Sequence, residues 1–380
     1  MDINELRKQI DEIDRQIVDL YGKRMETAGA IGRYKREHNL PVFDSERERI
    51  LLNRVAEQAG EENERGVRAL YHLLMDHSRM RQETDGHPES RLGQQIRDAV
   101  AAMPAFFPEK ASVACQGVEG AYSQLACEKM FRYPSVMYCR TFENVFSAIE
   151  SGLCQYGVLP IENSLAGSVN SVYDLMIRHQ CYIVRSVRIK IDHTLLALPG
   201  TKAEDIREIY SHEQAIQQCS AFLSAHKEWH VNVCTNTAAA ARMVAESGRS
   251  DAAAISSGHC AALYGLECLS SEIQNNSNNH TRFICISKKP EIYPGADRVS
   301  LMLVLPNHPG SLYQLLSRFN ALDINLIKLE SRPLPGRDFE FMFYFDLEAS
   351  VGSPVFSRLI EELDISLSQF SYLGSYSEIV

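Results

Sequence analysis

Apolar residues recur three or four positions apart at the start of the chain and mark one side of a helix. They are Ile3, Leu6, Ile10, Ile13, Ile17 and Leu20. This heptad-like spacing predicts a helix with a narrow apolar seam that runs to about Glu37. Farther along the seam, Arg24 and Lys35 stand where apolar residues are expected. Because a buried cation is costly unless it is paired, we expect both side chains to meet an anion.

Two further helices are predicted before residue 90. Pro41 ends the first helix, and Asp44 or Ser45 can cap a second helix from Glu46 to Ala59. A third helix is predicted from about Arg65 to Gln82. The N-terminal region is therefore expected to be all-helical.

Polar residues within these apolar faces indicate a site for a small anion. Ser78 and Gln82 lie one turn apart on the buried side of the third helix. Arg24 and Lys35 are about 16 Å apart along a helix, so their long side chains can converge on one molecule. Arg7 is roughly 25 Å from Arg24 and can reach the same ligand only from a second protomer. A helix of this length also lacks enough partners in one chain, and both arguments predict a dimer.

The segment from residue 1 to about residue 90 resembles the all-helical chorismate mutases. The matching residues are Arg7, Arg24, Lys35, Asp44, Arg47, Glu48, Ser78 and Gln82. The resemblance implies a rearrangement of chorismate to prephenate, in which the enzyme holds a chair-like conformer and stabilises negative charge on the ether oxygen. It assigns the arginines to the two carboxylates, and Lys35 and Gln82 to the ether oxygen. Glu48, with Asp44, would hold the ring hydroxyl.

The pattern changes after residue 90. Residues 91–109 contain charged residues, prolines and one short helical stretch, Leu92 to Val100, and we interpret them as a linker. From residue 110 to 288, short apolar runs alternate with helical stretches, which is typical of α/β proteins. Turns with Gly, Ser, Thr and Asn recur between them, and each can donate hydrogen bonds to a carboxylate. Any one of these turns alone is better explained as ordinary helix capping.

A polar loop near the end of this region carries the clearest candidate chemistry. Asn275–Asn279 contains only Asn and Ser, whose side chains compete for backbone hydrogen bonds and disfavour regular structure. Thr281 and Arg282 follow, and the apolar run Phe283–Ile286 predicts a buried strand. The loop therefore delivers a hydroxyl and a guanidinium to the rim of a sheet, where α/β proteins bind small anions. A solvated loop before an ordinary strand is the plainer alternative.

Together, the turns and this loop resemble the prephenate dehydratase domain. The matching motifs are Gly117–Ser123, Pro160–Val169, Ser211–Cys219 and Asn279–Phe283, with Val118 where many relatives have proline. The resemblance implies a two-lobed α/β fold with the site in the cleft, and loss of carbon dioxide and hydroxide from prephenate without a metal. It assigns Thr281 as the essential proton donor, acting through a hydrogen-bond relay, with His212 and His280 as candidates for support. The residues expected to bind prephenate are Asn163, Ser164, Ser211, Thr237, Arg282 and Phe283, with Arg282 as the carboxylate partner.

The C-terminal region, residues 297–380, has a pattern of its own. Its strands and helices are predicted in the order βαββαβ, which is the ferredoxin-like α+β arrangement, with a third strand from Asp338 to Glu348. The region resembles ACT domains that sense phenylalanine. The resemblance implies an L-phenylalanine pocket between paired copies, formed by Gly310, Ser311, Leu312, Glu330, Ser331 and Arg332.

Composition excludes several other classes of protein. The chain has 380 residues, a net charge of −10 and a pI near 5.7, which favours neither nucleic acid nor anionic membranes. No apolar run approaches the roughly 20 residues of a membrane-spanning helix, and the charged N-terminus does not have the pattern of a signal peptide. Ten cysteines are scattered without a C-x-x-C pair, which predicts reduced thiols, no zinc site and a cytoplasmic protein.

The three resemblances follow one another along nearly the whole chain. They predict a multidomain, bifunctional enzyme of phenylalanine biosynthesis that converts chorismate to prephenate and prephenate to phenylpyruvate. We expect feedback inhibition by L-phenylalanine, no cofactor, and a homodimer or higher homo-oligomer. One alternative is a prephenate dehydratase whose helical arm only dimerises, and the polar residues on the seam argue against it. Another is a non-catalytic ligand-binding protein, which would have no use for Thr281 as an acid.

Overall fold

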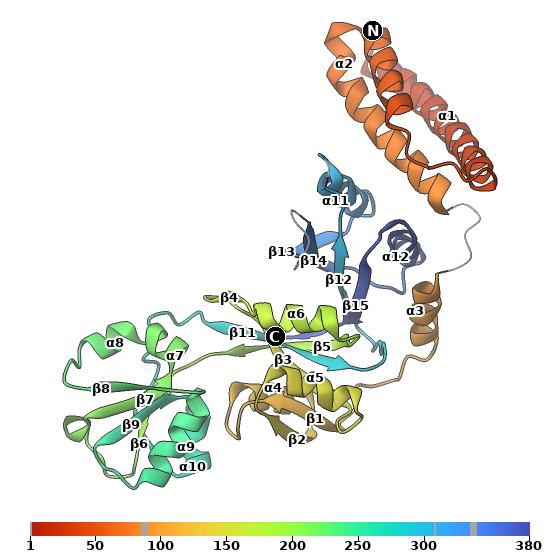
Figure 1. The fold of residues 1–380 in the computed structure, drawn as a ribbon. Coiled ribbons are helices and arrows are strands. Elements are labelled where there is room, and N and C mark those ends of the chain that lie inside the picture. Colours follow the sequence, from red (N-terminus) through yellow and green to blue (C-terminus); the bar gives the residue numbers. More distant parts are fainter. Residues whose placement is uncertain (1, 85–89, 308, 335–339) are drawn as a thin grey trace. The chain divides into compact units, whose positions relative to one another are not determined.

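The computed structural model describes residues 2–84, 90–307, 309–334 and 340–380. The chain forms two compact units (Figure 1). Unit 1 consists of Met1–Arg97 with Leu301–Tyr372, and unit 2 consists of Asp98–Ser300 with Leu373–Val380. Among the described residues, no helix has the length and apolar character needed to span a membrane.

Two long helices, α1 (Ile3–Glu37) and α2 (Ser45–Thr84), pack against each other in unit 1. The first is a single helix, as predicted. The second is interrupted at Gly60, whose φ of 69° and ψ of 164° suit glycine far better than other residues. This break lies between the two helices predicted from the sequence. Close approach of α1 to α2 depends on Gly32, because a Cβ there would lie 2.7 Å from the Cα of Gln82.

The predicted apolar seam of α1 lies on the surface of the single chain. Its members are 42% to 63% exposed, and they are Ile3, Leu6, Ile10, Ile13, Ile17 and Leu20. The second half of the helix differs, because Ala28, Gly29 and Gly32 are buried. The first half of α1 therefore presents an uncovered apolar face.

Helix α3 (Arg91–Ala101) occupies most of the segment predicted to be a linker. Ile96 is buried, and a Cβ on Gly93 would collide with the Glu361 side chain. Arg97 forms an ion pair with Glu361, which lies on α12 (Pro354–Ser366). The short predicted helix is confirmed, but it packs against the rest of unit 1 rather than acting as a free spacer.

The remainder of unit 1 has the predicted βαββαβ order of elements. The elements besides α12 are β12 (Arg298–Val304), α11 (Ser311–Ala321), β13 (Asn325–Pro333), β14 (Phe341–Glu348) and β15 (Phe370–Tyr376). The four strands form one sheet in the order β13-β14-β12-β15, so β12 and β15 are neighbours. Both strands cross the boundary between the two units. In β12 the boundary follows Ser300, and in β15 it precedes Leu373. The predicted start of a strand at Asp338 lies outside the described residues.

The larger lobe of unit 2 is built on a seven-stranded mixed sheet (Figure 1). In spatial order its strands are β16 (Glu378–Ile379), β5 (Tyr182–Lys190), β11 (His280–Ser287), β3 (Tyr156–Asn163), β1 (Lys110–Gln116) and β2 (Tyr133–Cys139), with β4 (Gly167–Ser168) paired to β3. The helices of this lobe are α4 (Tyr122–Met130), α5 (Phe142–Glu150) and α6 (Asn170–Arg178). Buried apolar side chains of β1, β3, β5 and β11 form its core.

A smaller lobe is inserted between β5 and β11. Its strands, in spatial order, are β10 (Glu267–Ser270), β6 (Thr194–Ala197), β9 (Ala252–Ser256), β7 (Glu208–His212) and β8 (His230–Cys234). Its helices are η1 (Ala203–Asp205), α7 (Glu213–Gln218), α8 (Ser220–Ser224), α9 (Thr237–Ser247) and α10 (His259–Tyr264). The two sheets confirm the predicted two-lobed α/β arrangement.

Candidate functional site

A cavity of about 540 Å³ lies between the two lobes of unit 2. The larger lobe contributes Asn163, Thr281 and Phe283 to its lining, and the smaller lobe contributes His212 and Thr237. Among the described residues that line it, none is Asp, Glu, Lys or Arg. The polar groups of the cavity are therefore amides, hydroxyls, imidazoles and backbone groups.

Two neighbouring antiparallel strands place the central residues of this cavity. Thr281 on β11 pairs with Asn163 on β3, and Phe283 pairs with Pro160. Side chains alternate between the two faces of a strand, so residues 163 and 160 would ordinarily face opposite sides. A register shift between Arg282 and Phe283 places one extra residue in β3, and Asn163 and Pro160 both line the cavity.

The side-chain amide of Asn163 orients the Thr281 hydroxyl. Asn163 Oδ1 accepts hydrogen bonds from the backbone N–H groups of Leu165 and Ala166, at 3.0 and 2.8 Å. These bonds leave Asn163 Nδ2 to donate to Thr281 Oγ1 at 2.9 Å. Because Thr281 Oγ1 accepts this hydrogen bond, its own O–H is available to donate into the cavity.

The same amide begins a chain of hydrogen bonds that reaches the smaller lobe. Asn163 Nδ2 also donates to Asn279 Oδ1 at 2.8 Å, and Asn279 Nδ2 donates to Gln218 Oε1 at 3.0 Å. His193 Nε2 lies 2.8 Å from the same Gln218 oxygen, so this nitrogen carries a hydrogen. Burial lowers the pKa of His193, which keeps the ring neutral at neutral pH. Its Nδ1 is then a buried acceptor, and it has no hydrogen-bond partner among the described residues.

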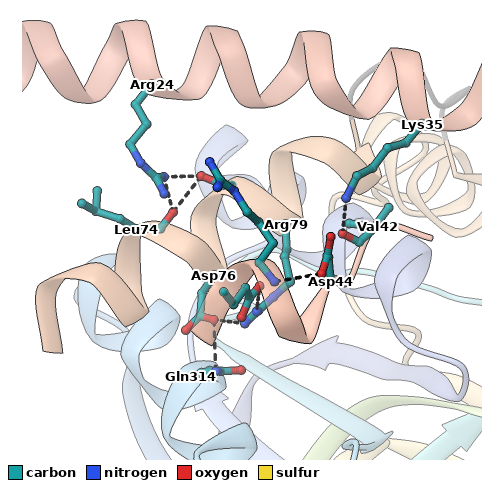
Figure 2. A network of polar contacts seen from close by, with 11 residues as sticks. Arg24, Lys35, Val42, Asp44, Leu74, Asp76, Arg79 and Gln314 are labelled. Atoms are coloured by element: carbon teal, nitrogen blue, oxygen red, sulfur yellow. Dashed lines mark hydrogen bonds and ion pairs between the residues drawn. The ribbon is translucent and has the colours of Figure 1, made fainter. Parts of the chain in front are cut away.

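The helical part of unit 1 holds a second set of polar residues. Figure 2 shows Arg24 and Lys35 extending from the same side of α1. Arg24 donates to the Leu74 carbonyl oxygen at 2.6 Å and to Ser78 Oγ, and Lys35 Nζ donates to the Val42 carbonyl oxygen at 2.7 Å. Burial lowers the pKa of Arg24. The oxygens that these two cations contact are neutral, so binding of an anion beside the cations is favourable.

Acidic and amide groups lie on α2 near these cations. Glu48 and Asp76 both form ion pairs with Arg79 (Figure 2 shows Asp76 and Arg79). Gln82 is buried, and its Oε1 has no hydrogen-bond partner among the described residues. The helical part thus combines cations, a carboxylate and a buried amide in one region.

Comparisons with known proteins identify the family of the chain. The family model for prephenate dehydratase matches residues 113–291, and the model for chorismate mutase type II matches residues 6–83. The bifunctional chorismate mutase/prephenate dehydratase of Escherichia coli (strain K12) is 31% identical over 98% of this chain and 95% of its own length. The chain belongs to the bifunctional chorismate mutase/prephenate dehydratases. It combines an isomerase and a lyase of phenylalanine biosynthesis in one polypeptide.

Other relatives match a smaller part of the bifunctional chain. The arogenate dehydratase/prephenate dehydratase 2 of Arabidopsis thaliana is 39% identical, over 70% of this chain and 72% of its own length. Among solved structures, the prephenate dehydratase of Arthrobacter aurescens in complex with L-Phe is 28% identical with a TM-score of 0.63. That match covers 70% of this chain and 89% of the Arthrobacter chain.

Two helices of the dehydratase begin at the cavity, one from each lobe. Tyr122 and Ser123 open α4, and Thr237 opens α9; all three residues line the cavity. Asn236 Oδ1 caps α9 by accepting from the Ala239 N–H at 2.7 Å. Helix N-termini present free backbone N–H groups and favour negative charge. The cavity is therefore electropositive at two places, although the described residues that line it include no cationic side chain.

Some predicted dehydratase residues do not line the cavity. Ser211 is fully buried and donates to the Ile255 carbonyl oxygen at 2.7 Å. Ser164 Oγ accepts from the His280 N–H at 2.9 Å and so fastens the polar loop to the end of β3. These two serines hold the backbone around the cavity rather than entering it.

Arg282 corrects an expectation from the sequence. It follows Thr281 on β11, and adjacent residues of a strand point to opposite faces. Its guanidinium is 6% exposed and donates to Tyr376 Oη at 3.0 Å. Arg282 is absent from the cavity lining. The predicted contact of Arg282 with a substrate carboxylate is therefore not supported.

The structure brings several of the predicted mutase residues near one another. Arg24 meets Ser78, and Lys35 reaches the loop that contains Asp44 (Figure 2). Asp44 caps α2 by accepting from the backbone N–H of residue 47 at 2.9 Å, which places Arg47 in the first turn. Arg7 lies apart from them, because it is exposed on α1 about 25 Å from Arg24.

Sequence reasoning missed four residues that the structure adds to these sites. His193 and Gln218 end the hydrogen-bond chain that Asn163 begins. Asp76 and Arg79 form ion pairs beside Glu48, and Asp76 also accepts from Gln314 Nε2 of α11 at 3.1 Å. The signal for the second pair was present, because Asp76 and Arg79 are three apart on one helix face. His193 gave no local signal, since its partner Gln218 lies 25 residues farther along the chain.

Proposed function

We propose that prephenate reacts in the cavity of unit 2, with Thr281 donating to the leaving hydroxyl. The proposal is supported above all by the Asn163 amide, which donates to Thr281 Oγ1 and directs the threonine hydrogen elsewhere. As the C–O bond breaks, the hydroxyl leaves with the bonding pair, and the donated hydrogen bond stabilises its growing negative charge. The ring carboxylate leaves as carbon dioxide, and its electron pair completes the aromatic ring of phenylpyruvate.

The remaining groups of the cavity suit a substrate with two carboxylates. The N-termini of α4 and α9 lie in different lobes, so each can hold one carboxylate. A substrate that contacts both lobes favours closure of the cleft over it. His193 is neutral and presents Nδ1 as an acceptor, so it can receive a hydrogen bond from a hydroxyl or a water.

Replacing Thr281 by valine tests the proposed role of its hydroxyl. Thr281→Val keeps the shape of the side chain and removes the donor. Given chorismate, this variant should accumulate prephenate at the normal rate and form almost no phenylpyruvate, followed by absorbance. Continued phenylpyruvate production would show that the hydrogen comes from another group.

We further propose that chorismate binds between α1 and α2, with Arg24, Lys35 and Gln82 around it. Arg24 and Arg47 would hold its carboxylates, and Lys35 with Gln82 would stabilise charge on the ether oxygen. The neutral partners of both cations support this assignment, because an anion completes their electrostatics. Glu48, with Asp44, would hold the ring hydroxyl.

The uncovered seam of α1 supports a dimer in solution. Six apolar residues on one helix face are 42% to 63% exposed, and burying them against a second copy would be favourable. A second α1 packed along this seam can also bring Arg7 to the site of its neighbour. We propose that each mutase site uses Arg7 of the other protomer.

Inhibition by L-phenylalanine is proposed to act through the βαββαβ part. The similar Arthrobacter dehydratase was solved in complex with L-Phe. Gly310 has a φ of 91° and precedes Ser311 and Leu312 at the start of α11, where backbone N–H groups favour a carboxylate. Glu330–Arg332 lies on β13 and would complete the pocket. The effector would act by binding one state of the dehydratase cleft better than the other.

A further inference from the structure

A partly buried ionic cluster lies on the face of β11 opposite the dehydratase cavity. β11 pairs with β3 on one side and β5 on the other, so Arg282 stands between Glu162 and Arg188. Arg282 Nη1 is 3.9 Å from Glu162 Oε2. Two arginines directly opposite each other repel, so this face needs further negative charge.

Glu378 on β16 supplies this charge. Its side chain is 1% exposed, and its carboxylate oxygens lie 2.9 Å from Arg188 Nη2, 3.1 Å from Arg298 Nη2 and 3.6 Å from Arg282 Nε. Removing a carboxylate from an ionic group that is largely buried leaves its cations with less compensating charge. Glu378 is therefore a negative charge that Arg188, Arg282 and Arg298 share.

The backbone fixes Glu378 against the sheet. β16 runs parallel to β5, with Glu378 opposite Ser186, and the Ser186 N–H donates to the Ser377 carbonyl oxygen at 3.0 Å. Gly374 has a φ of 139°, and a Cβ there would overlap the Ile183 carbonyl group. Only glycine lets this segment lie so close to β5.

The cluster meets β11 where the pairing of that strand with β3 is irregular, while its pairing with β5 is regular there. The pairing of β11 with β3 shifts register between Arg282 and Phe283, and such a shift interrupts the regular ladder of hydrogen bonds. Side-chain contacts of Arg282 can therefore help to set the position of the neighbouring Thr281 on the β3 side. A displacement of about 1 Å at a reacting group can lower a rate about a hundredfold.

We propose that Glu378 is a positioning residue of the dehydratase, which holds Arg282 and thereby sets the place of Thr281 in the cavity. The proposal rests on the proposed role of Thr281. Glu378 follows the entire βαββαβ part in the chain, yet it acts on the reaction in the preceding domain.

The test compares Glu378→Gln with Glu208→Gln in the full-length enzyme. Glu208 is a matched control, since it pairs with Arg249 at 3.1 Å in the same unit and lies away from β11. We expect kcat for prephenate to fall about tenfold in Glu378→Gln, with KM changed by less than about twofold and the mutase rate unchanged. The control should leave all three values unchanged. A normal kcat in folded Glu378→Gln would overturn the proposal.

A double-mutant cycle with Arg282→Gln separates positioning from general stability. If Glu378 acts through Arg282, replacing Glu378 lowers kcat little further once Arg282 is gone. Losses that multiply would overturn the proposal. Should Glu378→Gln not fold, Glu378→Asp keeps the charge on a shorter side chain, and a normal kcat there counts equally against it.

Thr281→Val measured in parallel distinguishes two kinds of failure. An active Thr281→Val refutes the proposed function itself. An inactive Thr281→Val together with a fully active Glu378→Gln refutes only the positioning role of Glu378.

Discussion

The orientation of the Asn163 side-chain amide decides in which direction the Thr281 hydroxyl can donate its hydrogen bond. Asn163 Oδ1 accepts hydrogen bonds from two backbone N–H groups, and Asn163 Nδ2 donates to Thr281 Oγ1. The sequence pointed to both residues as site members through a family resemblance. It did not show their contact, because that contact depends on the register between β3 and β11 and on the extra residue in β3.

The variant Asn163→Asp tests this hydrogen-bond direction. The new carboxylate keeps the two bonds from Leu165 and Ala166, but it has no hydrogen to donate, so the Thr281 hydroxyl would turn to donate to it. We expect kcat for prephenate to fall about a hundredfold while the mutase rate is unchanged. Steady-state kinetics with added prephenate measure the effect, and Asn144→Asp, at an exposed position of the same lobe, is the control. A rate near normal would contradict the assigned direction of the hydrogen bond between Asn163 and Thr281.

Burial of His193 gives the folded protein a dependence on pH. Its pKa is lowered from the ordinary value of 6.5, so the folded state favours the neutral ring. Below pH 6.5 the unfolded chain gains a proton that the folded chain resists, and the free energy of unfolding decreases. We expect this decrease to be smaller in His193→Gln, as measured by denaturant titrations at several pH values. Identical pH profiles for both proteins would show that His193 does not cause the effect.

Elements differ in how far their local sequence determines them. The helical arm could be predicted, because its apolar spacing is set within the helix itself. The packing of α3 could not, because Gly93 and Arg97 meet Glu361, which is 264 residues beyond Arg97 in the chain. By composition alone, a short segment with prolines and charges cannot be distinguished from a linker, because its packing depends on a distant partner.

The apolar seam of α1 predicts mutase sites that are shared between two protomers. Arg7→Ala and Lys35→Ala should each abolish prephenate formation and leave turnover of added prephenate intact. Mixing them should restore about a quarter of the normal mutase rate, since half of the dimers are heterodimers with one intact site of two. Chorismate consumption after subunit exchange measures this recovery. No recovery, with exchange verified, would show that each site lies within one protomer.

For the whole molecule, the main correction concerns where one domain ends. Residues 297–380 were predicted as one domain, but Arg298, Ser300 and the segment Leu373–Val380 belong to unit 2. The sequence could not show this, because β12 and β15 have continuous strand patterns across the boundary. The neighbouring strands also bring Ser300 and Leu373 close together, as the Val304 N–H donates to the Gln369 carbonyl oxygen at 3.0 Å.

Two deletions should therefore behave differently. Replacing residues 301–372 by a short Gly/Ser linker keeps β16 and Glu378, and we expect dehydratase activity that L-phenylalanine no longer affects. Deleting residues 297–380 removes Arg298 and Glu378 and should abolish most of that activity. Phenylpyruvate formation with and without L-phenylalanine measures both, with mutase activity as the internal control. Inhibition that survives the first deletion would place the effector site outside residues 301–372.

The position of β16 also sets the order in which the dehydratase can fold during translation. The ribosome releases β5 at residues 182–190, but its edge partner at residues 378–379 follows only after the whole βαββαβ part. Until then the edge of β5 is open, and open strand edges favour aggregation. The nascent middle domain thus begins folding early and finishes late, so its vulnerable period lasts through the synthesis of a different domain.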